Sequence, residues 1–235
     1  MQELLQWRQD MVNMMVHDLR NSLTSMILSA HILKYPNLPL EKQKLKVNQI
    51  ISAGEELQSM IDGLLIMAKL ESGKMVLNYS EVDIYSFCQS VVEEFTAIAE
   101  NKNIQFISDL PKPGSSIKVD EPIFRRIINN IVSNAVKFSP ANSKIILRAN
   151  YLADDSAKFE IIYFRPGVKK ELQEKIFNKY EIGTKINNTS QTGLGLAFCK
   201  MAIEAHGGKI TLQDNHPQGS IFTVEVPAIC TSTSV

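Results

Sequence analysis

The sequence predicts a helical hairpin followed by a layered α/β domain. Up to about Glu71, apolar residues recur at alternating spacings of three and four, which is the heptad pattern of helices that pack side by side. After Gly73 the pattern changes to short strand-like runs that alternate with amphipathic helices, which is typical of helices covering one face of a sheet. Ser72–Gly73 separates the two patterns and is typical of a helix end. We therefore expect two domains, residues 1–73 and residues 74–235.

Composition narrows the class of protein. The chain of 235 residues has 25 basic and 25 acidic side chains, so its charge favours neither nucleic acid nor an anionic membrane as partner. Cys88, Cys199 and Cys230 show no paired or metal-like spacing and are expected to be reduced thiols of a cytoplasmic protein. No apolar run is long enough to span a membrane, and no signal peptide is evident. The chain begins directly in a helical pattern, which we interpret as a helix cut from a longer protein.

Two heptad runs define the hairpin. The break between them contains Pro36 and Pro39, which end helices. The first run is Val12, Val16, Leu19, Leu23, Met26, Ala30 and Leu33, and the second is Val47, Ile50, Gly54, Leu57, Ile61, Leu64 and Ala68. Ile27, Ile51 and Leu65 widen the apolar face, so a lone hairpin would leave much of it in water. Two copies paired into a four-helix bundle would cover it. The alternative is packing on the second half of the same chain, and we favour the homodimer.

The second half has the pattern of an α/β domain. Its predicted helices lie near residues 84–100, 121–137, 169–178 and 194–206. Its strand-like runs are Met75–Leu77, Ile104–Ile107, Ile145–Leu147, Phe159–Ile162 and Ile221–Val224. Residues 153–156 have the composition of a hairpin tip. The polar segment 181–192 is rich in turn formers and could close over a ligand.

Three groups of residues are candidates for chemistry. His17, Asp18 and Asn21 place an imidazole, an acid and an amide within one helical turn, although these residues alone favour an ordinary solvated surface. The spacing of a second group, Asn130, Asn134 and Lys137, places these residues on one helix face. They could hold hydrated magnesium and the phosphates it bridges, or they could form an ordinary solvent-exposed face. In the third, Gly193 and Gly195 open a helix whose amides could bind an anion, which is a weak signal on its own.

The order of these motifs resembles the catalytic core of a two-component sensor histidine kinase over roughly residues 10–228. His17 through Asn21 matches the family's H-box, and Asn130 through Phe138 matches its N-box. Residues 176–180, with Phe177, match the F-box, and residues 192–196 match the second glycine box. The resemblance implies a dimerisation and phosphoacceptor hairpin followed by an α/β sandwich ATP-binding domain of the GHKL type.

The resemblance also implies roles for the residues. His17 would attack the γ-phosphate of ATP, Asp18 would act as base or orienting carboxylate, and Asn21 would position the water that hydrolyses a phosphorylated partner. That partner would be the receiver domain of a response regulator with an acceptor aspartate.

The nucleotide site would hold ATP and Mg²⁺. Asn134 would be the metal ligand, Asn130 would support it, and Lys137 would contact phosphate oxygens. Phe177, Gly193 and Gly195 would complete the nucleotide-binding surface.

The first glycine box departs from the family pattern. Tyr163 stands where the family has the aspartate that accepts a hydrogen bond from the adenine amino group, and Arg165 replaces a glycine, whereas Gly167 is kept. Gln191 and Ser22 replace a glycine and a proline, respectively. Loss of the acceptor should cost on the order of 1.5–3 kcal/mol of binding free energy. Tyr163 and Arg165 could fill the adenine slot, or Tyr163 could stack on the base or restore the bond with its hydroxyl.

Three functions stay open on the sequence. The first is an active kinase with unusual or weak affinity for ATP. The second is a (pseudo)kinase impaired in ATP binding that acts as a response-regulator phosphatase or docking platform. The third is a dimeric signalling scaffold. The intact H-box and N-box favour the first.

Overall fold

The computed structural model describes residues 2–152, 156–164, 173, 175–177, 195–215 and 218–228, with only the backbone for residues 2–15, Asp18 and Glu71. The described residues form two compact units, a helical unit that ends at Lys69 and an α/β unit that begins at Leu70. The domain boundary predicted at Gly73 stays a prediction.

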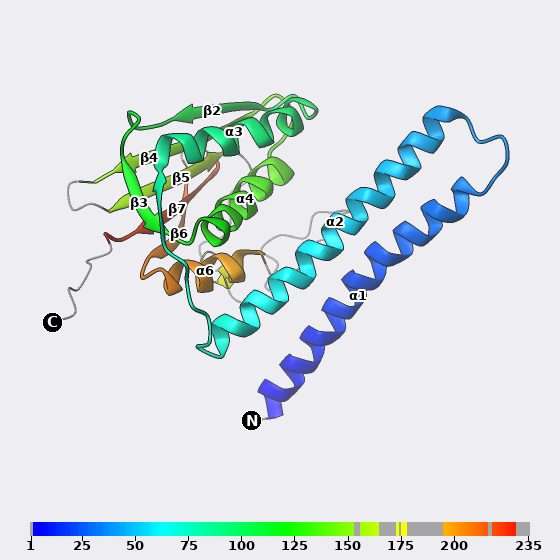
Figure 1. The fold of residues 1–235 in the computed structure, drawn as a ribbon, viewed down its shortest axis with the longest axis horizontal. Coiled ribbons are helices and arrows are strands. Elements are labelled where there is room, and N and C mark those ends of the chain that lie inside the picture. The colour runs from blue at the N-terminus through cyan, green and yellow to red at the C-terminus, as the bar shows by residue number, and fades with distance from the viewer. Residues whose placement is uncertain are drawn as a thin grey trace. The chain divides into compact units, whose positions relative to one another are not determined.

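The helical unit is an antiparallel hairpin of two long helices (Figure 1). Helix α1 spans Gln2–Leu33 and helix α2 spans Leu40–Glu71, so the turn falls at the predicted break. Ser22 bonds to Glu56, and Ser29 bonds to Gln49. The two residue numbers of each pair add up to the same sum, as expected when the two helices run in opposite directions. Gly73, with φ of 64°, ends α2 as expected because its N–H donates to the Leu70 carbonyl. No described helix is long and apolar enough to cross a membrane.

The α/β unit contains seven strands and three longer helices among the described residues. Its strands are β1 (Ser80–Asp83), β2 (Gln105–Asp109), β3 (Ser116–Val119), β4 (Lys144–Tyr151), β5 (Ala157–Tyr163), β6 (Lys209–Asp214) and β7 (Ser220–Val226). Its helices are α3 (Ile84–Glu100), α4 (Glu121–Phe138) and α6 (Gly195–Ala205), with a 3₁₀ turn η1 at Lys175–Phe177.

Five of the strands form one mixed sheet in the order β2-β4-β5-β7-β6. Strands β2 and β4 are parallel, whereas β4–β5, β5–β7 and β6–β7 pair antiparallel. The predicted β4–β5 hairpin is therefore confirmed by its pairing, and its tip residues 153–155 lie outside the described residues. Strands β1 and β3 form a separate antiparallel pair.

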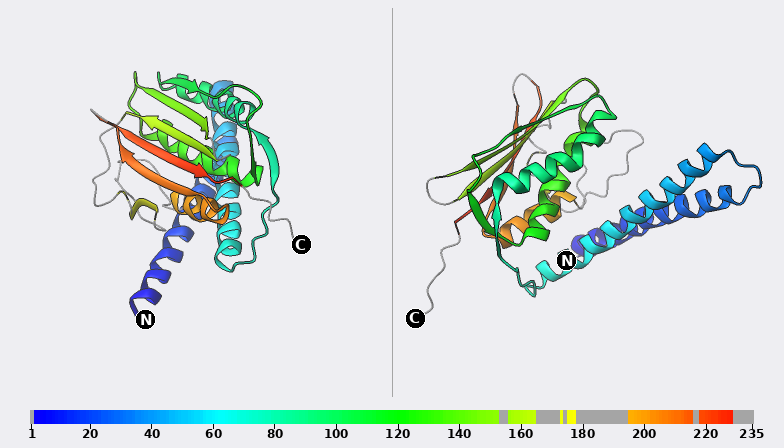
Figure 2. Two further views of the ribbon diagram at one scale, coloured as in Figure 1. Left: turned by 90° about the vertical axis from the view of Figure 1, so that its left-hand side faces the viewer. Right: turned by 45° about the horizontal axis from the view of Figure 1, so that its top comes forward.

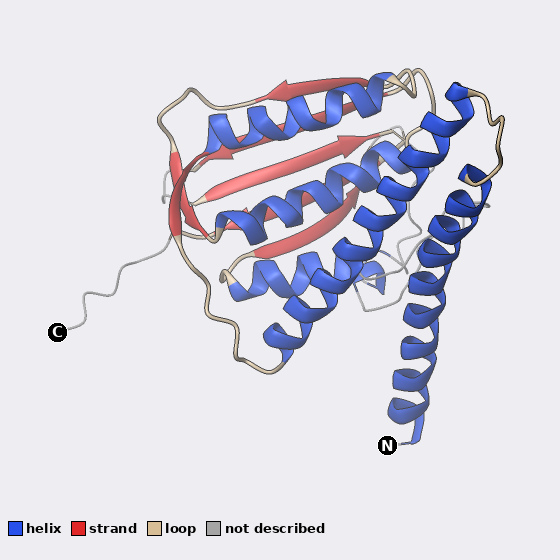
Figure 3. Ribbon diagram, turned by 45° about the vertical axis from the view of Figure 1, so that its right-hand side comes forward, coloured by secondary structure: helices blue, strands red, loops and turns tan. Residues whose placement is uncertain are grey.

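Helices α3, α4 and α6 cover one face of the sheet (Figures 2 and 3). The core lies in this layer, where Phe124 of α4 packs edge-on against Phe159 of β5 at a centroid distance of 5.1 Å. Both side chains are fully buried. Along β5, the alternation of a strand places Phe159, Ile161 and Tyr163 on this helix-covered face, while Lys158 and Glu160 lie on the opposite face.

A buried histidine ties the helix layer together. The Asp120 N–H donates to His206 Nε2 at 3.1 Å, and His206 Nδ1 lies 2.7 Å from the Ala202 carbonyl oxygen. The carbonyl can only accept, so Nδ1 carries the proton. The carboxylate of Asp120 also caps α4 by accepting from the Ile123 N–H. His206 is thus a structural residue.

Three strands were not predicted, and one predicted strand is wrong. The run Met75–Leu77 has no regular structure, and the strand begins later, at Ser80. Strands β1, β3 and β6 were missed because they are short and polar at alternate positions, so few apolar side chains identify them. The helix predicted at 169–178 lies mostly outside the described residues, which in this range show Gln173 in a helical conformation and the 3₁₀ turn η1.

Candidate functional site: the hairpin surface and the α4 face

His17 and Asn21 are in contact on the surface of α1. They are separated by four residues, which places them on the same helix face, and Asn21 Nδ2 lies 3.2 Å from His17 Nδ1. Both side chains are exposed. The side chain of Asp18 lies outside the described part, so the structure brings together two of the three residues predicted for this site. An exposed imidazole with an ordered neighbour is sterically open to attack a phosphoryl group.

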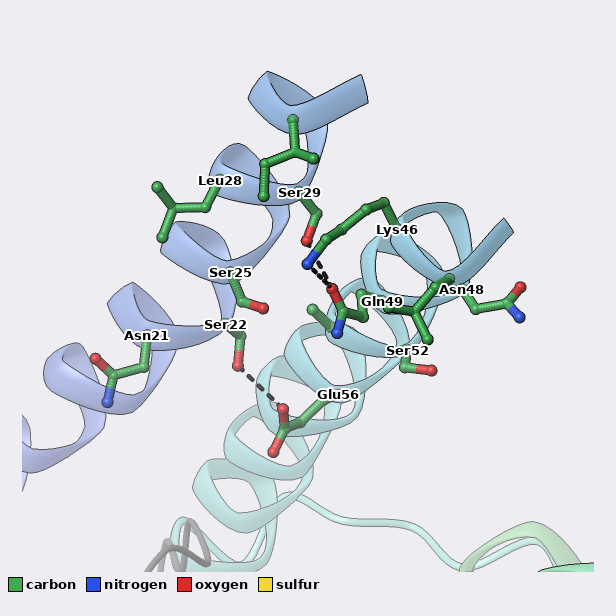
Figure 4. Close-up of a pocket in the computed structure, with 13 residues that line it drawn as sticks. Asn21, Ser22, Ser25, Leu28, Ser29, Lys46, Asn48, Gln49, Ser52 and Glu56 are labelled. Carbon is green, nitrogen blue, oxygen red and sulfur yellow. Dashed lines mark hydrogen bonds between the residues drawn. The ribbon is translucent and has the colours of Figure 1, made fainter. Parts of the chain in front are cut away.

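A polar groove between α1 and α2 adjoins this pair (Figure 4). Two of its serines are buried: Ser22 donates to Glu56 at 3.2 Å, and Ser29 donates to Gln49 at 3.3 Å. Lys46 also donates to the Gln49 side chain at 2.8 Å. The full lining is Asn21, Ser22, Ser25, Leu28, Ser29, Ile32, Leu45, Lys46, Asn48, Gln49, Ser52, Ala53 and Glu56. The sequence analysis missed this groove.

An apolar surface lies on the other side of the hairpin. The exposed apolar side chains on this side are Val16, Leu23 and Ile27 on α1 and Val47, Ile51, Ile61 and Leu65 on α2. At about 100° per residue, those on α1 lie roughly a third of a turn or more from Ser25 and Ser29. Ile27, Ile51 and Leu65, which were predicted to widen the apolar face, are 47%, 51% and 58% exposed. We call these seven residues the apolar face of the hairpin.

The α4 face holds the predicted N-box residues. Asn130, Asn134 and Lys137 are all half-buried on this helix. The start of α6 approaches the first of them, because a Cβ built on Gly195 would lie 3.8 Å from the Asn130 carboxamide. Lys137 Nζ lies 5.9 Å from the centroid of the Phe138 ring. The structure therefore places Gly195, at the start of α6, beside the side chain of Asn130.

The interface between α4 and α6 contains a buried thiol. Cys199 Sγ donates a weak hydrogen bond to the Ile127 carbonyl at 3.6 Å. Burial raises the pKa of the Cys199 thiol to about 12, although a hydrogen bond with Asn130 and the charge of Arg126 act in the opposite direction. Burial, with a smaller contribution from Asp83, also raises the pKa of Cys88 to about 12. These two cysteines are free, as predicted, and their burial is expected to make them unreactive.

Tyr163 belongs to an aromatic cluster at the end of β5. Its side chain is fully buried and lies parallel to Phe222 of β7, with ring centroids 6.1 Å apart and an interplanar angle of 8°. Phe177 meets the Phe222 ring edge-on at 6.1 Å. Thus the residue at the position of the adenine-binding aspartate is a core aromatic. Gly167, Gly193 and Arg165 lie outside the described residues.

Comparison with known proteins identifies both halves of the chain. Residues 7–73 match the family model of the His Kinase A (phospho-acceptor) domain. Residues 119–229 match the model of the histidine kinase-, DNA gyrase B- and HSP90-like ATPase. A phosphoacceptor hairpin followed by a GHKL-type ATPase fold defines the class of histidine kinase cores.

Individual relatives agree with this class. The chain is 28% identical over 229 residues to the adaptive-response sensory kinase SasA of Synechocystis sp. (strain ATCC 27184 / PCC 6803 / Kazusa), covering 95% of this chain and 60% of SasA. The structure of full-length ShkA in complex with AMPPNP has a TM-score of 0.68 at 26% identity, covering 93% of this chain and 45% of ShkA. The structure of histidine kinase ThkA in complex with the response regulator protein TrrA has a TM-score of 0.67 at 24% identity, and the match covers 96% of this chain and 63% of the ThkA chain.

The chain therefore belongs to the two-component sensor histidine kinases and comprises their catalytic core. It spans about three fifths of the length of SasA.

The buried thiols make a prediction about pH and reactivity. The pKa of Cys199 is raised in the folded state, so between about pH 9 and 12 the folded protein binds more protons than the unfolded chain, and its free energy of unfolding falls as pH rises. Below pH 9 this contribution is fully present. We expect peptide mass spectrometry after iodoacetamide treatment at pH 8 to find Cys88 and Cys199 unlabelled in the native protein and labelled in urea. Rapid native labelling of Cys199 would contradict its burial.

Proposed function

We propose that this chain autophosphorylates on His17 with ATP and passes the phosphoryl group to an aspartate in the receiver domain of a response regulator. Residues 1–73 would be the dimerisation and phosphotransfer domain, and residues 74–235 the catalytic domain. The observation that carries the proposal is the exposed His17–Asn21 pair on a hairpin of the phosphoacceptor family.

The reaction needs little covalent assistance from the protein. His17 supplies the nucleophilic ring nitrogen, and Asp18 is proposed as the base or orienting carboxylate. Lys137 and the amides at the start of α6 would neutralise phosphate charge, which is the main requirement of phosphoryl transfer. The AMPPNP complex of ShkA supports a nucleotide in a domain of this fold.

Magnesium is proposed to be held by few protein ligands. The described residues contain no group of three His, Cys, Asp or Glu side chains that could bind a metal. Magnesium in nucleotide sites takes few protein ligands and keeps waters and phosphate oxygens. The half-buried Asn134 is proposed as its protein ligand, with Asn130 in support.

The polar groove is the proposed docking surface for the receiver domain. Asn21 lines the groove and also contacts His17, so a partner seated there would reach the phosphoacceptor. Leu28, Ile32 and Leu45 supply apolar contacts around the polar lining. The complex of ThkA with TrrA supports a response regulator as the partner. In the opposite reaction, Asn21 is proposed to position the hydrolytic water.

The aromatic cluster favours a second candidate function. Tyr163 has no carboxylate to accept a hydrogen bond from an adenine amino group, and its ring is packed against Phe222. A chain that binds ATP poorly for this reason would act as a phosphatase or dimeric scaffold through its hairpin. Calorimetry with magnesium and AMPPNP separates the candidates, because no heat at millimolar nucleotide would exclude the kinase.

We expect the protein to be a homodimer in light scattering, because pairing covers the apolar face of the hairpin. Ile27→Glu or Leu65→Glu places a charge on that face and should give monomers. Leu28→Glu is the matched control: Leu28 is 58% exposed but lines the groove, so this variant should stay dimeric. A wild-type monomer at micromolar concentration would contradict the bundle.

His17→Gln should abolish incorporation of phosphate from γ-labelled ATP, because glutamine has no nucleophilic ring nitrogen. Thr24→Ala, two turns along α1, should incorporate label like the wild type. The measurement is acid-labile label on the purified protein. Label that persists in His17→Gln would place the acceptor at another residue.

Tyr163→Asp should tighten nucleotide binding by about tenfold to a hundredfold, because it returns an acceptor worth roughly 1.5–3 kcal/mol. Tyr163→Phe keeps the stack with Phe222 and should leave the affinity unchanged. Calorimetry with AMPPNP gives the affinities, and thermal unfolding shows whether each variant is folded. Unchanged affinity in folded Tyr163→Asp would mean that the missing acceptor does not limit binding.

A further inference from the structure

The chain enters the first strand of the α/β unit beside the start of α4. Strand β1 pairs antiparallel with β3, and the pairing begins with Ser80 opposite Val119. Ser80 Oγ also donates to the Val119 carbonyl at 3.4 Å. Val119 is followed directly by Asp120, which is the N-cap of α4. The antiparallel register therefore brings the residues just before β1 next to this cap.

Asp120 accepts hydrogen bonds from both sides of this junction. Its Oδ2 accepts from the Asn78 N–H at 2.9 Å, and its Oδ1 accepts from the Ile123 N–H in the first turn of α4 at 3.3 Å. Its own N–H donates to His206, just after the end of α6. Asp120 is only 5% exposed, so water competes little for these bonds. One carboxylate thus joins the segment before β1 to the first turn of α4.

The segment that reaches Asn78 has no regular structure. Residues 74–79 lie in neither a helix nor a strand, and they follow α2, the second helix of the hairpin. Tyr79 adds a second contact to the bond from Asn78, because its ring meets the His206 ring edge-on with centroids 5.7 Å apart. The α/β unit therefore holds the end of this segment at two neighbouring residues. A displacement of the segment would act first on Asp120 and, through the cap, on α4.

We propose that Asp120 is a positioning residue that couples the segment between α2 and β1 to α4, the helix that carries the proposed nucleotide ligands. This inference rests on the proposed function. Asn130, Asn134 and Lys137 follow on the same helix, which is packed by buried side chains from Ile123 to Val136. A closely packed helix passes a shift of its first turn to the residues further along. Coupling is reciprocal, so a nucleotide bound on α4 strengthens the bond from Asn78 to Asp120.

Calorimetry with magnesium and AMPPNP on the full chain tests this coupling. Asn78→Pro removes the N–H donor and leaves Asp120 in place, whereas Asn78→Ala keeps the donor and is the matched control. Val76→Pro places proline in the same segment, at a position that is 79% exposed. Asp120→Asn keeps the size of the side chain and one capping oxygen but loses the second acceptor. Asn78→Pro and Asp120→Asn should each bind AMPPNP about threefold to tenfold more weakly, and both controls should match the wild type.

The double variant separates coupling from simple loss of stability. The losses of Asn78→Pro and Asp120→Asn should not multiply when the two are combined, because both substitutions remove the same bond. Thermal unfolding shows which variants are folded, and a residue that serves stability alone would lower the unfolding temperature without this change in affinity. Losses that multiply, or equal affinities in Asn78→Pro and Asn78→Ala, would overturn the inference.

Amide exchange followed by NMR gives a readout that needs no nucleotide. Loss of the bond from Asn78 leaves the Asp120 carboxylate free to turn, so the Ile123 N–H should exchange about threefold to tenfold faster in Asn78→Pro than in Asn78→Ala. The Ile131 N–H, further along α4, should exchange at the same rate in both. A wild type that gives no heat with AMPPNP counts against the proposed kinase, and the exchange result then decides this inference. Equal exchange rates of the Ile123 N–H would overturn it.

Discussion

The helical period of α1 is the constraint on which the rest of the hairpin depends. Because a helix has 3.6 residues per turn, the side chains of α1 fall into three sets that point in three different directions. Ser22 and Ser29 face α2 and hold the hairpin together, and Leu23 belongs to the apolar face. His17 and Asn21 stay at the surface beside the groove. A residue inserted into α1 between His17 and Ser29 would rotate one set against the others. The reactive pair, the groove and the apolar face are thus coupled by backbone geometry.

The hairpin could be predicted because its heptad pattern continues over many residues. A heptad pattern that repeats through each helix indicates helix, pairing and turn together, and the observed bounds of α1 and α2 agree with it. The groove was missed because the sequence analysis followed only the apolar positions of the two helices. Ser22, Ser25 and Ser29 are nevertheless spaced by three and four, so they form a stripe parallel to the apolar one. That spacing is the signal that could have identified a buried polar contact.

The alternation of side chains along β5 explains why a substitution in the first glycine box leaves the fold intact. Tyr163 has the same parity as Phe159 and Ile161, so its side chain must enter the helix-covered face of the sheet. A carboxylate at this position needs a polar partner to offset its desolvation, whereas an aromatic ring gains from burial beside Phe222. The identity of the residue was plain in the sequence. Its stacking depends on β7, whose pairing with β5 no local pattern reveals.

At the end of β5, the side chain that stabilises the core is not the one that the family uses to bind adenine. On α1 the two requirements do not conflict. His17 and Asn21 are exposed, so replacing either leaves the packing of the hairpin largely unchanged, and selection on chemistry can act there almost alone. Tyr163 sits in the core, so any change that favours a nucleotide must also be tolerated by Phe222 and Phe177. A substitution at Tyr163 therefore changes the packing of the core and the nucleotide-binding surface proposed for this domain at the same time.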